Sequence, residues 1–191
     1  MTRVAIIDNY DSFTFNLVHL VDQITPNWVC YRNDEVNWED LNDATHILFS
    51  PGPGLPSEAG QMPAIIERFK GDRSMFGICL GFQAMAESLG GRLYNLDEIF
   101  HGVQTRIKIQ PETQLFSGIP ASIAVGRYHS WAVQNAEQWR ITAVDDQEIP
   151  MAAENVEMGM YGVQFHPESI MTEFGLEMVQ NWLKSPSPRR R

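Results

Sequence analysis

Cysteine is scarce in this sequence of 191 residues, which contains only Cys30 and Cys79. Two thiols exclude a disulfide-rich secreted scaffold and a zinc site built from four thiolates. The sequence also lacks a long apolar run, so we expect neither a secretion signal nor a membrane-spanning helix, and we predict a cytoplasmic protein. A chain of this length buries roughly 70% of the surface that its unfolded form exposes, so its core needs no disulfides.

Basic residues are in the minority, with 14 Lys and Arg against 24 Asp and Glu, which gives a formal net charge of −10. This balance argues against a nucleic-acid-binding protein, because binding to a phosphate backbone requires a basic face. The one basic run is the arginine triplet at 189–191. We expect a single domain at residues 1–184 and a disordered basic tail at 185–191.

The first ninety residues alternate between apolar runs and segments with helical spacing. Four short apolar runs are typical of strands buried on both faces: residues 3–8, 28–31, 46–49 and 75–78. Three segments favour helices: residues 12–24, 62–69 and 80–89. Ser12 is a suitable cap for the first helix, and Cys30 is interpreted as a small buried core residue. The alternation predicts an α/β fold, with a mostly parallel central sheet and helices on both faces.

Residues 92–165 have a different pattern, in which short alternating segments are separated by turns and no convincing helix intervenes. This pattern predicts antiparallel strands that extend or flank the sheet. The candidate strands are residues 103–109, 122–125, 139–144 and 158–165. A last amphipathic helix is predicted at 172–183.

The sharpest chemical signal is Gly77-Ile78-Cys79-Leu80-Gly81, at the junction of a predicted buried strand and a helix. A nucleophile in such a turn projects from the carboxyl end of the sheet, and flanking glycines relieve crowding. The helix N-terminus favours negative charge and leaves N–H groups free to bind an oxyanion. Spacing alone leaves a second interpretation open, since a buried cysteine is commonly a small apolar filler.

His166-Pro167-Glu168 supports a catalytic cysteine. A thiol nucleophile needs an imidazole to take and return its proton, and a third group to fix the imidazole tautomer. On an extended backbone His166 and Glu168 face the same side, so Glu168 can orient the ring. The alternative is an ordinary surface pair. Zinc deaminases share His-x-Glu, but they also need Pro-Cys-x-x-Cys, which this sequence lacks, so no metal site is predicted.

The loop Ser50-Pro51-Gly52-Pro53-Gly54 follows another predicted buried strand. Glycines allow backbone amides to approach a ligand, and prolines stiffen the loop in advance. The loop matches neither a phosphate-binding nor a dinucleotide-binding motif. An oxyanion or a substrate carboxylate is therefore the better occupant, and an ordinary turn is the alternative.

Five motifs in this order resemble the triad-type (class I) glutamine amidotransferase family, and the resemblance covers about residues 3 to 184. The motifs lie at 9–14, 50–54, 77–84, 127–130 and 164–169. The family has a flavodoxin-like α/β fold with an antiparallel strand-rich extension. The opening Asn-Tyr-Asp-Ser-Phe-Thr resembles the branch that serves chorismate enzymes, namely component II of anthranilate synthase or of aminodeoxychorismate synthase.

The resemblance implies roles for the matching positions. The implied catalytic triad is Cys79, His166 and Glu168. The implied oxyanion hole consists of the backbone N–H groups of Gly52 and Leu80. The residues implied to bind glutamine are Gly52, Pro53, Gly54, Gln83, Ser130 and Trp131. We expect a rim that faces a partner subunit, containing Tyr10, Asp11, Ser12 and His101.

The sequence departs from the family pattern at three places. Phe82 stands where a histidine is common, and we interpret it as a packing residue because His166 already supplies the base. A lysine common in the loop after Gly102 is missing, which affects details of partner contact. Trp131 replaces a leucine and would widen the apolar wall of the glutamine site. His129 is interpreted as packing or hydrogen-bonding locally.

The implied activity is hydrolysis of L-glutamine to glutamate and ammonia through a cysteine thioester. The length leaves no room for a chorismate-binding or ATP-binding domain, so we expect a synthase subunit (component I) as partner. No cofactor is expected in this chain, whereas the partner is expected to need magnesium. The stretch 125–131 favours anthranilate synthase, with aminodeoxychorismate synthase in folate synthesis, or both, as the alternative. A stand-alone γ-glutamyl cysteine hydrolase and a catalytically silent binding module are the competing classes.

Overall fold

The protein was studied as a computed structural model that describes residues 2–135, 137–185 and 188. The strands are β1 (Val4–Asp8), β2 (Trp28–Arg32), β3 (His46–Phe49), β4 (Ser74–Ile78), β5 (Arg92–Asn95), β6 (Val103–Ile109), β7 (Ser122–Arg127), β8 (Trp131–Gln134), β9 (Arg140–Val144), β10 (Pro150–Asn155) and β11 (Met160–Val163). The helices are α1 (Thr14–Asp22), α2 (Trp38–Asp43), α3 (Met62–Phe69), α4 (Leu80–Ser88) and α5 (Gly175–Leu183), with a short 3₁₀ helix η1 (Pro56–Glu58).

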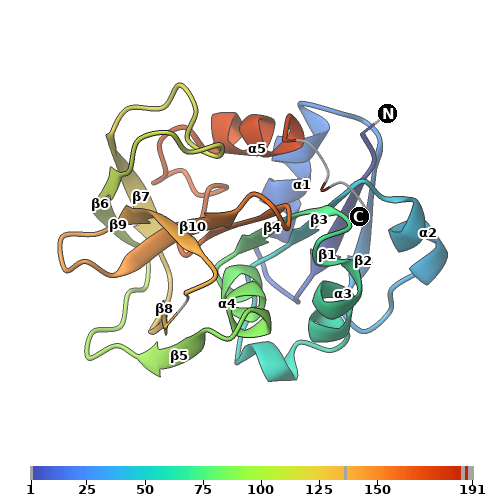
Figure 1. Ribbon diagram of the computed structural model, residues 1–191, viewed down its shortest axis with the longest axis horizontal. Helices are drawn as coiled ribbons and strands as arrows, with labels where there is room; N and C mark the ends of the chain where they lie inside the picture. Colours follow the sequence, from blue (N-terminus) through green and yellow to red (C-terminus); the bar gives the residue numbers. More distant parts are fainter. Residues whose placement is uncertain (1, 136, 186–187, 189–191) are drawn as a thin grey trace.

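The main sheet has the strand order β2-β1-β3-β4-β11-β10-β9-β6-β7. The strands from β2 to β11 in this order run parallel, and the remaining pairs are antiparallel. Helices α1 and α5 cover one face and α3 and α4 cover the other (Figure 1). The predicted α/β fold with a mostly parallel sheet is therefore confirmed.

Strand β1 shows how the sequence builds two cores. Its five residues are all buried, and neighbouring side chains alternate between the faces of the sheet. Ile6 belongs to the core beneath α1 and α5, and Ile7 to the core beneath α3 and α4. A continuous apolar run is needed because both faces are covered.

Strand β2 differs from its prediction. It lies at the edge of the sheet and pairs only with β1, so its residues are half-buried or exposed. The interpretation of Cys30 as a buried core residue is wrong, since its thiol is exposed on this edge. An apolar run alone did not distinguish an edge strand from a central one.

The start of α1 also differs. Ser12 is exposed and does not cap the helix, which begins at Thr14. Two carboxylates take its place: Asp11 accepts a hydrogen bond from the Phe13 N–H at 2.8 Å, and Asp8 accepts one from the Thr14 hydroxyl at 2.8 Å. These bonds tie the start of the helix to the end of β1.

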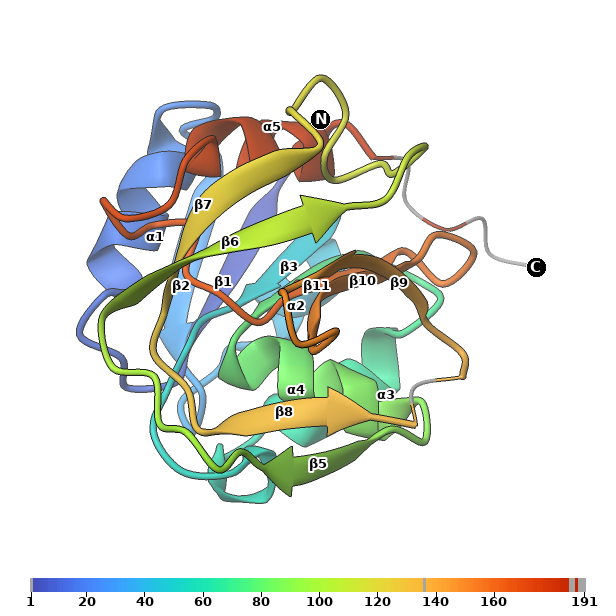
Figure 2. The ribbon, with the colours of Figure 1, turned by 90° about the vertical axis from the view of Figure 1, so that its left-hand side faces the viewer.

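The antiparallel part forms a curved extension of the sheet (Figure 2). Strands β6, β7 and β9 confirm three of the predicted segments. The fourth contains β11, which is antiparallel to β10 but parallel to β4, so it belongs to the centre of the sheet. Strands β5 and β8 form a separate two-stranded sheet beside α4, and these strands, together with β10 and α2, were not predicted.

The C-terminal helix α5 begins at Gly175, later than predicted, because Phe174 has a left-handed φ of 60° and Gly175 packs directly against the Pro167 backbone. Ser185 is buried, and its Oγ lies 2.9 Å from Ser74 Oγ. Most of the predicted tail, residues 186–187 and 189–191, lies outside the described residues. Within the described part of the chain, no helix has the length and apolar character needed to cross a membrane.

Candidate active site

Polar side chains follow four parallel strands at the same edge of the sheet. Asn9, Ser50, Cys79 and Gln164 come directly after β1, β3, β4 and β11, respectively. Asn9 donates hydrogen bonds to the Ser50 hydroxyl and carbonyl oxygens, both at 2.8 Å. The carboxyl ends of parallel strands are where open α/β sheets collect their sites, so this edge is the candidate active site.

Cys79 occupies the turn between β4 and α4 with a φ of 50° and a ψ of −102°. The turn is possible because its two glycines leave room for the backbone. A Cβ on Gly77 would lie 2.5 Å from the Gly81 carbonyl carbon, and one on Gly81 would lie 2.6 Å from the Phe49 oxygen. The predicted nucleophile turn therefore has the local geometry that presents a side chain at the end of a strand.

His166 and Glu168 form a buried pair. His166 Nδ1 lies 2.6 Å from Glu168 Oε1, and the His166 carbonyl accepts a hydrogen bond from the Thr172 hydroxyl at 2.6 Å. His166 Nε2 is buried and has no hydrogen-bond partner among the described residues. The Tyr128 ring lies 4.8 Å from the imidazole, measured between centroids. The pair thus holds one ring nitrogen and leaves the other available.

The charge of His166 is set by its two neighbours. Burial acts to lower the pKa of the ring, but the interactions with Cys79 and Glu168 outweigh burial and raise it to about 10. Cys79 is therefore close enough to act on the charge of the imidazole. The imidazole of His166 is therefore suited to hold a proton.

Gly52 and Leu80, the implied oxyanion donors, lie against each other. A Cβ on Gly52 would lie 2.9 Å from a Leu80 side-chain carbon and 2.6 Å from the Asn9 carbonyl oxygen. Leu80 is the first residue of α4, so its N–H has no acceptor within the helix. Pro53 and Gly54 follow in the loop and are exposed.

A chain of hydrogen bonds links the implied glutamine-binding residues to the thiol. Gln83 Nε2 donates to the Trp131 carbonyl at 3.1 Å and to Gln164 Oε1 at 3.2 Å. Gln164 Nε2 in turn lies 3.6 Å from Cys79 Sγ. Ser130, next to Trp131, is half-buried, and its carbonyl accepts a bond from the Leu96 N–H.

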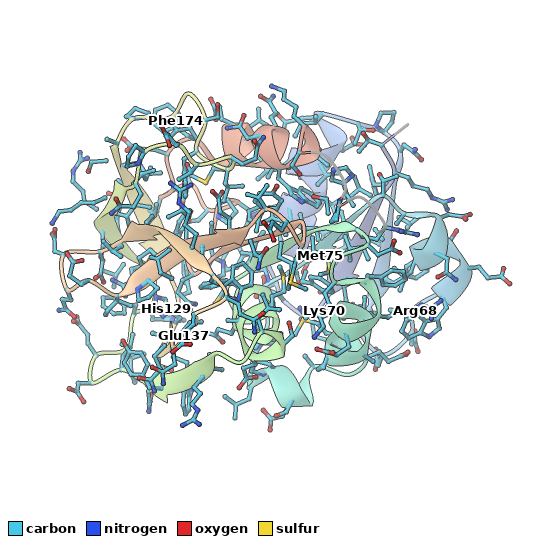
Figure 3. All side chains as sticks on the ribbon, in the orientation of Figure 1. Arg68, Lys70, Met75, His129, Glu137 and Phe174 are labelled. Atoms are coloured by element: carbon cyan, nitrogen blue, oxygen red, sulfur yellow. The ribbon has the colours of Figure 1, made fainter. Side chains whose placement is uncertain are left out.

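His129 continues this network away from Cys79. Its Nε2 accepts a hydrogen bond from Arg127 Nε at 3.1 Å, and its Nδ1 lies 2.8 Å from the Trp131 oxygen. Arg127 is buried and pairs with Asp145 at 2.7 Å. The interpretation of His129 as a locally bonded residue is confirmed. Figure 3 labels it on the side of the molecule that carries β8.

Phe82 points away from this network. It is fully buried in the core beneath α3 and α4, where its ring packs edge-on against Trp139 at 5.8 Å between centroids. A Cβ on Gly162 would lie 2.2 Å from the same ring. The prediction that Phe82 is a packing residue is confirmed.

Three of the residues expected at a partner-facing rim lie together in the loop after β1. Tyr10 has a left-handed φ of 61°, its hydroxyl donates to the Asp34 carboxylate at 2.7 Å, and the Arg32 guanidinium lies over its ring. Ser12 is exposed. Burial raises the pKa of Asp11, whose carboxylate also interacts with the charges of the His166 and Glu168 pair.

His101 comes from the antiparallel part and is exposed. Its ring lies 6.2 Å from that of Tyr128, which also contacts Phe13 at 5.7 Å between centroids. Through Tyr128 both segments reach His166. The loop after β1 and the loop before β6 therefore meet beside the candidate active site.

Sequence reasoning missed Gln164, Tyr128 and Thr172 as site residues, although the first two lie within recognised motifs. Their contacts with Cys79 and His166 depend on strand register and loop packing, which no local pattern reveals. Among the described residues no group of three or more His, Cys, Asp or Glu side chains is arranged to hold a metal ion.

The chain is similar to a known protein family and to several known proteins. Residues 5–185 match the glutamine amidotransferase class-I family. The chain is 42% identical over 185 residues to anthranilate synthase component 2 of Lactococcus lactis, covering 94% of this chain and 93% of that protein. It is 35% identical over 187 residues to aminodeoxychorismate/anthranilate synthase component 2 of Bacillus subtilis, covering 95% and 96%. The crystal structure of a glutamine amidotransferase from Thermotoga maritima has a similar fold, with a TM-score of 0.75, 17% identity and coverage of 96% and 81%.

Proposed function

Because this chain belongs to the class I glutamine amidotransferase family, we propose that it is the glutaminase subunit of a chorismate-using synthase, namely anthranilate synthase. In this proposal it hydrolyses L-glutamine to glutamate and ammonia, and the ammonia passes to the synthase subunit. Cys79 is the nucleophile, His166 the general base and acid, and Glu168 the residue that orients His166.

The first half of the reaction forms the thioester. Cys79 gives its thiol proton to His166 Nε2 as its sulfur attacks the side-chain amide carbon of glutamine, and the amide oxygen becomes an oxyanion. His166 then gives its Nε2 proton to the departing nitrogen, so ammonia leaves and a glutamyl thioester remains. In the second half His166 takes a proton from water, which attacks the thioester, releases glutamate and restores the thiol.

The oxyanion is held by the backbone N–H groups of Gly52 and Leu80. The α-amino and carboxylate ends of the substrate are held by the backbone of Gly54 and by that of Ser130 and Trp131, with Gln83 and Pro53 completing the pocket. This assignment rests on the family motifs and on the contact between Gly52 and Leu80.

The observation that carries the proposal is the buried arrangement of Cys79, His166 and Glu168. The 2.6 Å contact fixes His166 through Nδ1, which leaves Nε2 free on the side where Cys79 acts on the charge of the ring. A silent binding module would have no need of an unpartnered imidazole nitrogen beside a strained cysteine.

The partner is proposed to dock over the rim formed by Tyr10, Asp11, Ser12 and His101. Several large apolar side chains are exposed in segments that adjoin this rim or the His166 loop: Tyr10, Phe15, Ile99, Val103, Ile170 and Phe174. Single exposed apolar residues are ordinary, but their concentration in segments around one site favours a protein partner there. Docking also shields ammonia from water, where it would become a non-nucleophilic ammonium ion.

The experiment compares Cys79→Ser with Cys30→Ser in the complex with the synthase subunit. Cys79→Ser is expected to lower glutamine-dependent anthranilate formation by at least about 10³-fold, since a hydroxyl is far less ionised than a thiol. Ammonia-dependent synthesis should persist, because the chemistry of the synthase does not use Cys79. Cys30→Ser should retain both activities.

Glutamine use by Cys79→Ser near the wild-type rate would contradict the proposed nucleophile. Equal, high glutamine turnover by the isolated chain and by the complex would instead favour a stand-alone γ-glutamyl cysteine hydrolase. Aminodeoxychorismate synthase is a second candidate partner, since the similar protein of Bacillus subtilis carries both names. Reconstitution with each synthase in turn distinguishes the two partners by the product formed.

A further inference from the structure

Gln164 is the first residue after β11, and the sheet register places it beside the candidate nucleophile. Val163 pairs with Ile78 in the parallel register of β11 and β4, and the Cys79 N–H donates to the Val163 oxygen at 2.8 Å. Gln164 and Cys79, which follow Val163 and Ile78, therefore lie at equivalent positions where the two strands end. Gln164 is fully buried.

The orientation of the Gln164 amide is fixed by its partners. Gln83 presents an NH₂ group that donates both to the Trp131 carbonyl and to Gln164 Oε1. Because Oε1 of Gln164 is thereby the acceptor, its NH₂ group faces Cys79 Sγ at 3.6 Å. A primary amide in this orientation can only donate to the sulfur.

At the other end of the network, Arg127 and His129 also have only one possible direction of hydrogen-bond donation. Arg127 can only donate, so His129 Nε2 must accept from it, and the neutral ring then carries its hydrogen on Nδ1. That hydrogen is donated to the Trp131 oxygen. The buried Asp145 carboxylate anchors Arg127 and thus the whole series.

We infer that Gln164 is a thiolate-binding residue, which donates an amide hydrogen to Cys79 Sγ and is held in that orientation by Gln83. A hydrogen bond to a charged group stabilises that form over the neutral one, so the bond favours the reactive thiolate. Gln83 then has two roles, since the residue proposed to bind glutamine also aligns the donor to the nucleophile. The inference rests on the proposed function only in treating Cys79 as the nucleophile.

The test measures the ionisation of the Cys79 thiol directly. A Cys30→Ser background leaves Cys79 as the sole cysteine, and the rate of its alkylation by iodoacetamide is followed against pH. Gln164→Met keeps the approximate length of the side chain but removes the donor. We expect the midpoint of the alkylation profile to rise by about one pH unit. Gln83→Met, which removes only the alignment, should raise it by less.

Gln138→Met is the matched control, because Gln138 donates to the Leu89 carbonyl and does not belong to the network. The titratable and charged groups around the site are unchanged in every variant: His166 with Glu168, His129 with Arg127, and Asp11. Circular dichroism and thermal unfolding verify that each variant is folded. If Gln164→Met does not fold, Gln83→Met tests the inference instead, through its smaller expected rise of the alkylation midpoint.

An unchanged midpoint in folded Gln164→Met, or an equal shift in Gln138→Met, would overturn the inference. Glutaminase assays of the complex give a second readout, in which Gln164→Met should lower kcat about tenfold with little change in KM. The alkylation profile needs no glutamine. A failed inference is therefore distinguishable from a wrong nucleophile, which retention of glutaminase activity by Cys79→Ser would reveal.

Discussion

His166 and His129 are both buried and belong to the same region, yet their surroundings drive their charges in opposite directions. His166 faces a carboxylate and a thiol, which raise its pKa to about 10 against the effect of burial. Burial and the neighbouring Arg127 guanidinium lower the pKa of His129 to about 4. One ring is therefore suited to hold a proton and the other to remain neutral.

The hydrogen bonds of the two rings differ in the same sense. His129 has both nitrogens bonded, one to Arg127 and one to the Trp131 carbonyl, so it has no site left for chemistry. His166 has one nitrogen bonded to Glu168 and the other without a partner among the described residues. Burial alone thus does not distinguish the two rings, whereas the unpartnered Nε2 of His166 does, and it supports the proposed role of His166 as base and acid.

Replacing His166 should have the largest effect of the variants considered. In the complex, His166→Ala is expected to lower glutaminase kcat by at least about 10³-fold, because the base and acid are lost. Glu168→Gln should cost less, since the base survives without its orienting charge. The double variant should be little worse than His166→Ala, and additive losses would show that Glu168 acts independently.

The pH dependence of the free energy of unfolding should distinguish the contributions of His129 and His166. Below pH 6.5 the unfolded chain protonates His129 but the folded chain does not until about pH 4, so the free energy of unfolding falls across this window. The loss from His129 is about 2 kcal/mol between roughly pH 7.5 and pH 5. His166 has the opposite sign, since its contribution is complete below pH 6.5 and is lost as the pH rises towards 10.

Urea unfolding of wild type and His129→Asn at both pH values measures this difference. The variant should lose about 2 kcal/mol less stability on acidification than the wild type, whatever its absolute stability. An identical loss in both proteins would mean that His129 is protonated in the folded state.

The smallest expected effect concerns the bond from His129 to the Trp131 carbonyl. The side-chain amide introduced by His129→Asn can donate from the position of Nδ1, whereas His129→Gln places its amide near Nε2 and loses that donor. We expect His129→Gln to raise the KM for glutamine about tenfold with kcat nearly unchanged, and His129→Asn to retain a KM close to the wild-type value. Equal KM values for the two variants would contradict a role of His129 in positioning the Trp131 carbonyl.

The parallel half of the fold was largely predictable because β1, β3 and β4 are buried on both faces and have continuous apolar sequences. Strand β2 has a similar composition but lies at the edge, and its place in the sheet depends on its neighbours. Strand β10 was missed because Pro150–Asn155 is made mostly of small and polar residues. Such a strand is stabilised by pairing with β9 and β11 more than by its own propensity.

The candidate active site likewise contains residues that the sequence predicts and residues that it does not. Cys79 and His166 are recognisable as candidates because the proposed chemistry requires particular residues at particular turns. Gln164 carries no such signal, since a neutral amide has no unusual charge or spacing. Its significance arises from the register that pairs Val163 with Ile78. Local sequence therefore predicts the candidate reacting groups, whereas only the fold shows which side chains lie beside them.

The position of β11 has a consequence for the synthesis of this chain on the ribosome. It is the last strand in the sequence but lies between β4 and β10. On the ribosome the N-terminal part of a chain emerges first, so Cys79 is exposed to glutamine well before His166 exists. During that interval β4 is an unpaired edge and the thiol has no base. In the proposed function, hydrolysis begins only when this last strand is inserted, so a nascent chain is expected to release no ammonia.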